Sequence, residues 1–146
     1  MEVGAFFGGN ALAAVDAAGR VRLPLFVRET LARRSDSGRV VFGAHDEAPC
    51  LSAYDPGYRA ALRDRNGSRR VFGFAEEAEV DSRGRVTLPP IMRWKGKIGS
   101  LALFVGTGGA IEIWNPELAL EADDPELRQM AEYRLDISSA EEEMTQ

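Results

Sequence analysis

The same pattern of charged and turn-forming residues occurs twice in this chain, in segments 15–28 and 80–93. The two segments agree at eight of fourteen positions, and the shared residues are Val, Asp, Gly, Arg, Val, Leu, Pro and Arg. Arginine suits phosphate, because its planar guanidinium can donate two parallel hydrogen bonds to phosphate oxygens. A repeat in a chain of 146 residues indicates a duplicated structural unit. The chemistry that both copies keep is that of a turn bearing arginines.

Each segment is predicted to form a β-hairpin whose turn presents an arginine. Asp16 and Asp81 can accept hydrogen bonds from the backbone two residues on, and Gly19 and Gly84 supply the positive φ of such turns. The next residues alternate polar and apolar, as in a half-buried strand. The candidate anion-binding side chains lie in these turns, strands and following helices: Arg20, Arg22, Arg28, Arg83, Arg85 and Arg93.

The two aspartates have a structural alternative. Asp16 could pair with Arg20, and Asp81 with Arg85, only to hold the turn in shape. A turn needs one partner for its aspartate, whereas several arginines crowd each hairpin. We therefore expect the arginines to contact a ligand. For the aspartates, a purely structural role and a role in the binding site both stay open.

The remaining sequence predicts an α+β fold, mainly β with short helices. Each copy continues from its hairpin into a helix, two more strands and a second helix. One such unit would expose too many strand edges, so two copies are expected to interleave into one barrel. We expect a first repeat at residues 4–66, a second repeat at 70–121, and a C-terminal helix with an acidic tail at 122–146. Strands are predicted at 12–15, 20–23, 39–43, 50–54, 85–88, 101–106 and 110–114, helices at 24–34, 56–65, 89–96, 116–121 and from 124, and no regular structure at 138–146.

The charge is distributed unevenly along the chain. The net charge is −5, but residues 117–146 sum to −8 and residues 1–116 to +3. A mildly basic body is compatible with nucleic acid, and the acidic tail is expected to aid solubility rather than to fold back on the hairpins. A further basic cluster is expected to be a solvated surface rather than a DNA contact: Arg59, Arg63, Arg65, Arg69 and Arg70.

The composition argues against an enzyme, a metal centre and a membrane protein. His45 and Cys50 are the only residues of their types, so no Cys/His metal cluster or internal disulfide is expected. Gly106–Gly109 lies between two predicted strands and is better explained as a hairpin turn than as a phosphate loop. No apolar run of about 18 residues or basic leader is present, which predicts a cytoplasmic protein. No cofactor and no small-molecule substrate are expected.

The two Asp-x-x-Gly-Arg hairpins, each followed by a proline at a helix start, resemble the MraZ family of bacterial transcriptional regulators. Phe104-Val105-Gly106 and Ile111-Glu112-Ile113-Trp114 support this resemblance, which spans about residues 4 to 120. It implies a swapped-hairpin, AbrB-like fold with two halves per chain. It also implies a homo-oligomeric ring at the nucleoid that binds direct repeats in double-stranded promoter DNA, upstream of the division and cell-wall gene cluster. The family's Asp-x-x-x-Arg signature falls on Asp16 with Arg20 and on Asp81 with Arg85, and the resemblance ties it to DNA binding.

The first turn departs from the family pattern. Ala17 and Ala18 carry less charge than the pair that members often have there, so the second hairpin, with Arg83, is expected to contribute more to DNA binding. The alternative function is an AbrB-like antitoxin or protein-interaction module whose acidic tail binds a basic partner. Antitoxins of that type usually carry one hairpin unit per chain, whereas this chain carries two.

Overall fold

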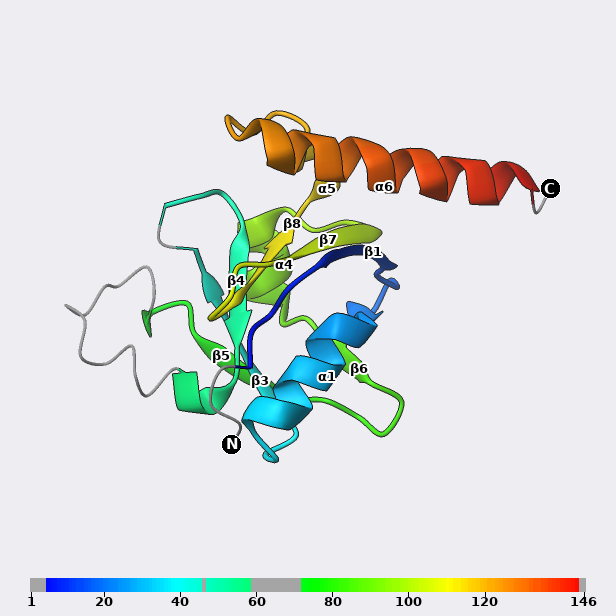
Figure 1. The fold of residues 1–146 in the computed structure, drawn as a ribbon. Coiled ribbons are helices and arrows are strands. Elements are labelled where there is room, and N and C mark those ends of the chain that lie inside the picture. Colours follow the sequence, from blue (N-terminus) through cyan, green and yellow to red (C-terminus); the bar gives the residue numbers. More distant parts are fainter. Residues whose placement is uncertain (1–4, 46, 59–71, 145–146) are drawn as a thin grey trace.

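The computed structural model describes residues 5–45, 47–58 and 72–144 (Figure 1). Its main element is a six-stranded antiparallel sheet, and a two-stranded ladder lies apart from it. In spatial order the sheet contains β1 (Asn10–Ala14), β7 (Leu101–Gly106), β8 (Ile111–Trp114), β4 (Leu51–Tyr54), β3 (Arg39–Ala44) and β5 (Glu76–Glu79). The ladder pairs β2 (Arg20–Arg22) with β6 (Arg85–Thr87). The predicted α+β class is confirmed, and the described strands form an open sheet rather than a closed barrel.

The sheet exchanges strands between the first part of the chain, which contains β1 to β4, and the second part, which contains β5 to β8. β1, from the first part, pairs with β7 from the second, and β5, from the second part, pairs with β3 from the first. The registers also match, because Ala14 lies opposite Leu101 just as Glu79 lies opposite Arg39. β4 and β8 join the two three-stranded groups at the centre. The two parts therefore share one sheet, while the repeat limits 4–66 and 70–121 stay a prediction.

The described helices are α1 (Leu25–Arg34), α4 (Pro90–Gly96), α5 (Pro116–Ala119) and α6 (Pro125–Met144). Pro24 and Pro89 precede α1 and α4 with extended backbone and so set the direction in which each helix leaves the ladder. α4 ends at Gly96 and is capped by Lys97, which adopts a left-handed conformation with φ 53°. Of the predicted helix 56–65, only residues 56–58 are described, and they are helical. The arginine cluster at 59–70 lies outside the described residues.

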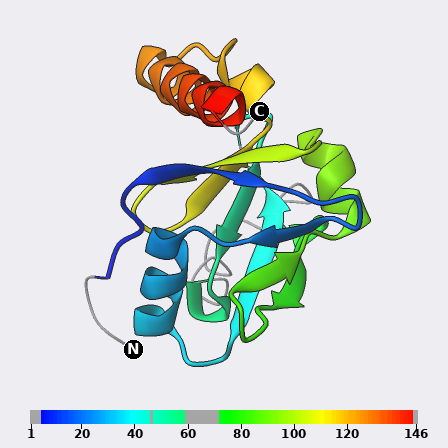
Figure 2. The same ribbon diagram turned by 90° about the vertical axis from the view of Figure 1, so that its right-hand side faces the viewer.

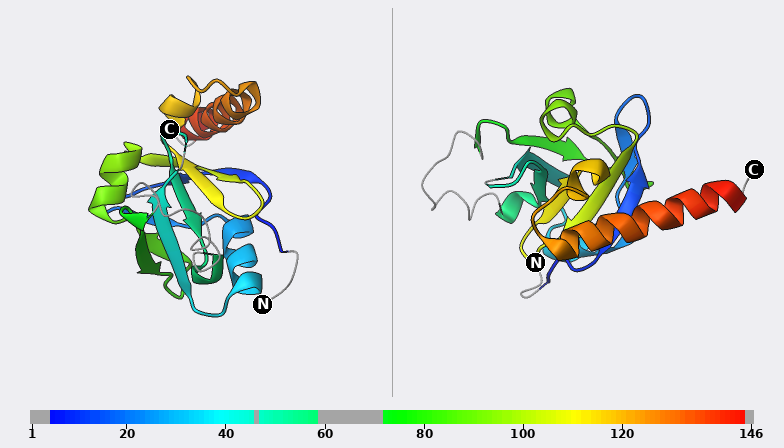
Figure 3. Two further views of the ribbon diagram at one scale, coloured as in Figure 1. Left: turned by 90° about the vertical axis from the view of Figure 1, so that its left-hand side faces the viewer. Right: turned by 90° about the horizontal axis from the view of Figure 1, so that it is seen from above.

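α6 contradicts the expectation that residues 138–146 lack regular structure, because the helix continues to Met144. Leu127 and Ala131 are buried on its inner face. Arg134 donates hydrogen bonds to the side-chain and backbone oxygens of Asn10, at 2.7 and 2.9 Å. The helix crosses one side of the molecule and its C-terminal end projects beyond the sheet (Figures 1 and 3). These contacts lie at residues 127–134, and residues 138–144 extend the same helix beyond them.

The main core lies between the ladder, the two helices that follow it and the sheet. Val21 and Val86 face each other across the ladder and are buried, so alternate ladder residues point to solvent. The other large side chains of this core include Leu23, Val27, Phe42, Leu88, Met92 and Phe104. A smaller cluster packs α5 and α6 against β7 and β8. None of the described helices is long and apolar enough to cross a membrane.

The crossing of the N-terminal segment over β7 depends on a glycine. A Cβ on Gly106 would lie 2.5 Å from the backbone oxygen of Phe7. Gly106→Ala is therefore expected to lower the free energy of unfolding by roughly 1–3 kcal/mol through overpacking. Chemical denaturation measures this change. Gly99→Ala is the control, because a Cβ there meets nothing within 4 Å, and equal losses in the two variants would contradict the prediction.

Candidate nucleic-acid interface

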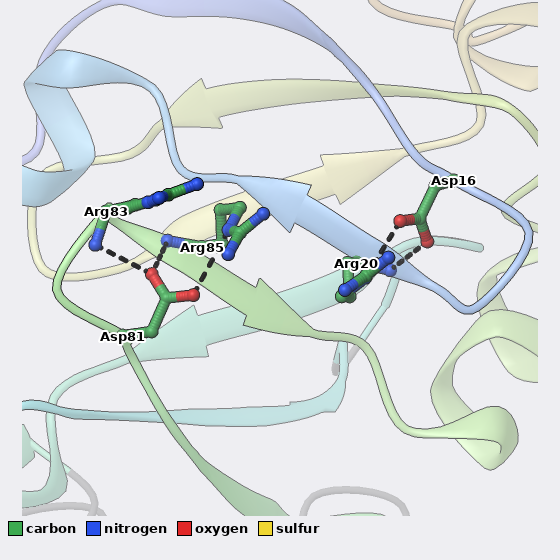
Figure 4. Close-up of polar contacts among 5 residues, drawn as sticks. All are labelled: Asp16, Arg20, Asp81, Arg83 and Arg85. Carbon is green, nitrogen blue, oxygen red and sulfur yellow. Dashed lines mark hydrogen bonds and ion pairs between the residues drawn. The ribbon is translucent and has the colours of Figure 1, made fainter.

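The β2–β6 ladder displays arginines on its solvent side. Arg22 lies directly opposite Arg85, and Arg20 lies opposite Thr87. Arg20 and Arg22 are exposed, and Arg85 is partly exposed. Because the strands are antiparallel, the two turns lie at opposite ends of the ladder (Figure 4). Three arginines thus share one rigid face between the two turns.

Each turn is held by its own aspartate. Asp16 Oδ1 accepts hydrogen bonds from the backbone N–H groups of Ala18 and Arg20, at 3.0 and 2.9 Å. Asp81 Oδ1 accepts from the N–H groups of Arg83 and Arg85, both at 2.9 Å. The aspartates therefore fill the structural role that the sequence left open.

The second carboxylate oxygen of each aspartate orients the signature arginine. Asp16 Oδ2 lies 2.9 Å from Arg20 Nε, and Asp81 Oδ2 lies 3.1 Å from Arg85 Nε. These ion pairs use the inner nitrogen of each guanidinium (Figure 4). Within the described part of the chain, the terminal nitrogens make no further hydrogen bond or ion pair. The backbone N–H of Arg20 lowers the pKa of Asp16, and that of Arg85 lowers the pKa of Asp81, in each case below the ordinary value for aspartic acid.

Arg22 and Arg83 have no such aspartate. Among the described residues, neither side chain makes a hydrogen bond or ion pair. Arg22 also faces the like charge of Arg85 across the ladder. The Leu23 N–H donates to the Gly84 oxygen at 2.9 Å, so the neighbouring Arg22–Arg85 pair is of the closer, non-hydrogen-bonded type. Like charges directly opposite are destabilising. Asp81 already compensates Arg85, and an anion bound to Arg22 would compensate the other guanidinium.

Arg28 and Arg93 are placed differently from the other predicted site residues. A Cβ on Gly84 would overlap Arg28 Cδ, and a Cβ on Gly19 would lie 2.8 Å from Arg93 Nε. Both arginines are half-buried. Arg28 Nε donates to the Leu23 oxygen at 2.9 Å, whereas Arg93 Nε is buried and has no hydrogen-bond partner within residues 5–45, 47–58 and 72–144. Their placement indicates that they support the turns, and a DNA contact by either stays a prediction.

These contacts cross between the two parts of the chain. The Asp16–Arg20 turn is covered by Arg93 of α4, and we call this pair of elements the first-turn unit. The Asp81–Arg85 turn is covered by Arg28 of α1, and we call this pair the second-turn unit. Figure 2 shows the loop between β1 and β2 reaching α4. The sequence paired each turn with the helix that follows it, and only the antiparallel ladder reveals the exchange.

His45, Cys50 and Glu112 bring their donor atoms within 4.8 Å of one another, away from the ladder. His45 Nε2 lies 3.0 Å from Glu112 Oε2, and this hydrogen bond lowers the pKa of Glu112. His45 Nδ1 accepts from the backbone N–H groups of Glu47 and Ala48, at 3.0 and 2.9 Å. Both imidazole nitrogens are therefore used within the protein, which favours a hydrogen-bonded cluster over a metal site.

Comparison with known proteins identifies the family of this arginine-bearing fold. No family model matches the chain. A protein of Saccharophagus degradans named "Transcriptional regulator MraZ" is 33% identical, and the match covers 76% of this chain and 83% of that protein. A protein of the same name from Nitrosococcus oceani is 32% identical over 95% of this chain and 94% of its own length. This chain belongs to the MraZ family. The relatives are named as transcriptional regulators, which confirms the expectations of a regulator and of no enzyme.

In this MraZ family member, the contact of Arg28 with the second turn can be tested with two glycines. Gly84 and Gly38 both have positive φ, 76° and 68°, so replacement by alanine strains the backbone at either site. Only Gly84 is covered by Arg28, while a Cβ on Gly38 meets nothing within 4 Å. Gly84→Ala is expected to cost roughly 1–2 kcal/mol more than Gly38→Ala in unfolding free energy. Equal costs in urea denaturation would mean that Arg28 does not support the turn.

The pKa of Asp81 predicts a pH dependence of stability. Because this pKa is lower in the folded state, the ionised carboxylate stabilises the fold above its unfolded pKa, and the stabilisation is lost as pH falls through the folded pKa. The difference in unfolding midpoint between the parent protein and Asp81→Asn should be largest near neutral pH and shrink below about pH 4. Asp123→Asn, at an exposed position, is the control. A difference that stays constant with pH would contradict the prediction.

Proposed function

We propose that the chain is a sequence-specific, DNA-binding transcriptional regulator that uses the exposed face of the β2–β6 ladder and its two turns. The observation that carries the proposal is the Arg22–Arg85 pair, in which two like charges face each other on an exposed, rigid ladder. Phosphate at Arg22 would supply the counter-charge that Arg22 lacks and that Arg85 already has in Asp81. The names of the relatives, all transcriptional regulators, support the same role.

The arginines are proposed to divide into positioning and reading groups. Phosphate contacts fix the protein on the duplex, whereas base edges carry the sequence information. Arg22 and Arg83 are proposed to bind phosphate, because among the described residues their side chains have no partner. Arg20 and Arg85 are held by aspartates in a fixed orientation. Such an oriented guanidinium suits bidentate hydrogen bonding to guanine in the major groove.

Assembly is proposed to supply the affinity that one chain lacks. A few phosphate contacts bind weakly, and that binding falls with salt by a slope of about −0.9 per phosphate. A homo-oligomeric ring would place adjacent chains on adjacent direct repeats, and linkage of this kind raises apparent affinity by roughly 10²–10⁴. We propose promoter DNA upstream of the division and cell-wall genes as the target, which would place the protein at the nucleoid in the cytoplasm.

The antitoxin alternative has no specific observation in its favour. It relied on an acidic C-terminal segment free to bind a basic partner. α6 is instead anchored to β1 through Arg134 and Asn10 and buries Leu127 and Ala131. The first half of α6, from Leu127 to Arg134, therefore belongs to the folded body.

The signature arginines provide the test of the proposed function. Arg20→Ala combined with Arg85→Ala is expected to abolish binding to DNA from upstream of the gene, because both reading groups are lost. Of the single variants, Arg85→Ala should weaken binding more, because the second hairpin, which also carries Arg83, is expected to contribute more to DNA binding than the first. Each single variant should lower the salt slope by no more than about one phosphate contact. Fluorescence anisotropy over a salt series measures both quantities.

Two controls make this test specific. Arg39→Ala removes an exposed arginine whose charge is already balanced by Glu77 and Glu79, and it should leave DNA binding unchanged. A scrambled duplex of the same length reports non-specific binding. Equal affinity of the parent protein for both duplexes would refute sequence-specific regulation. Unchanged operator binding by the double variant would show that these arginines are not the readers.

A further inference from the structure

α4 bears an exposed apolar face that the arginine-based site does not use. The side chain of Trp94 is 75% exposed, and that of Ile91 is 42% exposed. Residues three apart in a helix lie on the same face, so the two side chains form one surface. The other tryptophan, Trp114, is only 4% exposed. A tryptophan held in solvent forgoes a large gain from burial, which makes this surface a candidate for contact with another molecule.

The charge around this face points to an anionic partner. Residues 90–100 contain Arg93, Lys95 and Lys97 and no acidic residue. Lys95 lies on a neighbouring aromatic ring, with Nζ 5.1 Å from the centre of Phe74. An apolar face on a helix that carries bases and no acids suits a partner with both negative charge and apolar surface. DNA has both, since thymine methyl groups and sugars lie between its phosphates.

The helix that carries this face adjoins the arginine ladder. Arg93, next to Trp94, covers Gly19 in the Asp16–Arg20 turn. β6 leads into α4 at the end of the ladder where Asp16 and Arg20 lie (Figure 4). DNA bound along the ladder would therefore reach the helix that carries Trp94.

The matching helix of the other unit lacks this chemistry. The position in α1 that corresponds to Trp94 is Glu29, an exposed acid. Conversely, the uncharged Ala18 of the first turn corresponds to Arg83 of the second. The first-turn unit thus has the apolar residues Ala18 and Trp94 at positions where the second-turn unit has the charged residues Arg83 and Glu29.

We propose that Trp94, together with Ile91, packs into a groove of the bound duplex and makes an apolar contact with base edges and sugars. This inference rests on the proposed function and assigns a specificity-determining contact within it. Apolar side chains recognise the thymine methyl in the major groove and can wedge between base steps in the minor groove. The first-turn unit would then select sequence through shape and methyl groups, and the second-turn unit would supply most of the electrostatic attraction.

Tryptophan fluorescence tests the contact directly in the full-length protein. Addition of the upstream duplex is expected to shield Trp94 from acrylamide and to change its emission. Trp114 is buried and serves as an internal reference, and Trp94→Phe should remove the DNA-dependent signal. Binding is followed on the same samples by anisotropy of labelled DNA, so that occupancy is known at each point.

Affinity measurements provide a second test. Trp94→Ala is expected to weaken operator binding about ten-fold, comparable with the cost of one mismatched base pair. Its salt slope should not change, because no phosphate contact is lost. Leu25→Ala is the matched control, since Leu25 is 59% exposed at the start of α1, and it should bind as the parent does. Circular dichroism melts verify that each variant is folded.

The outcomes separate the two proposals. Saturating DNA that leaves Trp94 fully open to acrylamide, or normal operator affinity in Trp94→Ala, overturns the contact while the regulator role stands. Shielding of Trp94 that rises with protein concentration in the absence of DNA also overturns it, because a second copy then covers the face. Failure of the parent protein to distinguish the upstream duplex from its scrambled form refutes the proposed function and this inference with it.

Discussion

The antiparallel pairing of β2 with β6 is the constraint on which the rest of the structure depends. Leu23 donates its N–H to the Gly84 oxygen, and Leu88 donates its N–H to the Gly19 oxygen, both at 2.9 Å. Each strand is thereby tied to the turn of the other hairpin. Because the prolines that start α1 and α4 directly follow these leucines, the same pairing decides where both helices lie. The exchange of β1 and β5 in the main sheet repeats this crossing on a larger scale.

The presentation of the arginines follows from this crossing. The aspartate of each turn accepts two backbone N–H groups and the Nε of its signature arginine. The opposite helix lays an arginine over the glycine of the same turn. The terminal nitrogens of Arg20 and Arg85 are therefore held on a backbone that both parts of the chain restrain. Such preorganisation reduces the entropy lost when a ligand binds, which a mobile loop with the same residues would not achieve.

Local sequence patterns predicted much of this fold and site, and long-range contacts account for the rest. The turns, the alternation around Val21 and Val86, and the helices after Pro24 and Pro89 follow from neighbouring residues, and the structure contains them. The partner of each strand was not predictable in detail, since pairing joins residues far apart in the chain. The contact of Arg93 with Gly19 has the same origin. A helix from residue 124 was predicted, but its continuation over residues 138–144 was not, because the local sequence there is polar.

The unlike ends of the ladder bear on the kind of DNA that the protein would bind. A protein with two identical half-sites matches a palindrome, because its two-fold axis coincides with that of the operator. The backbone of this ladder approaches such symmetry, but its side chains break it, with Arg83 against Ala18 in the turns and Trp94 against Glu29 in the helices. A single chain therefore has a direction along DNA. A direct repeat also has a direction, so asymmetric side chains on a nearly symmetric backbone suit the proposed repeats better than a palindrome would.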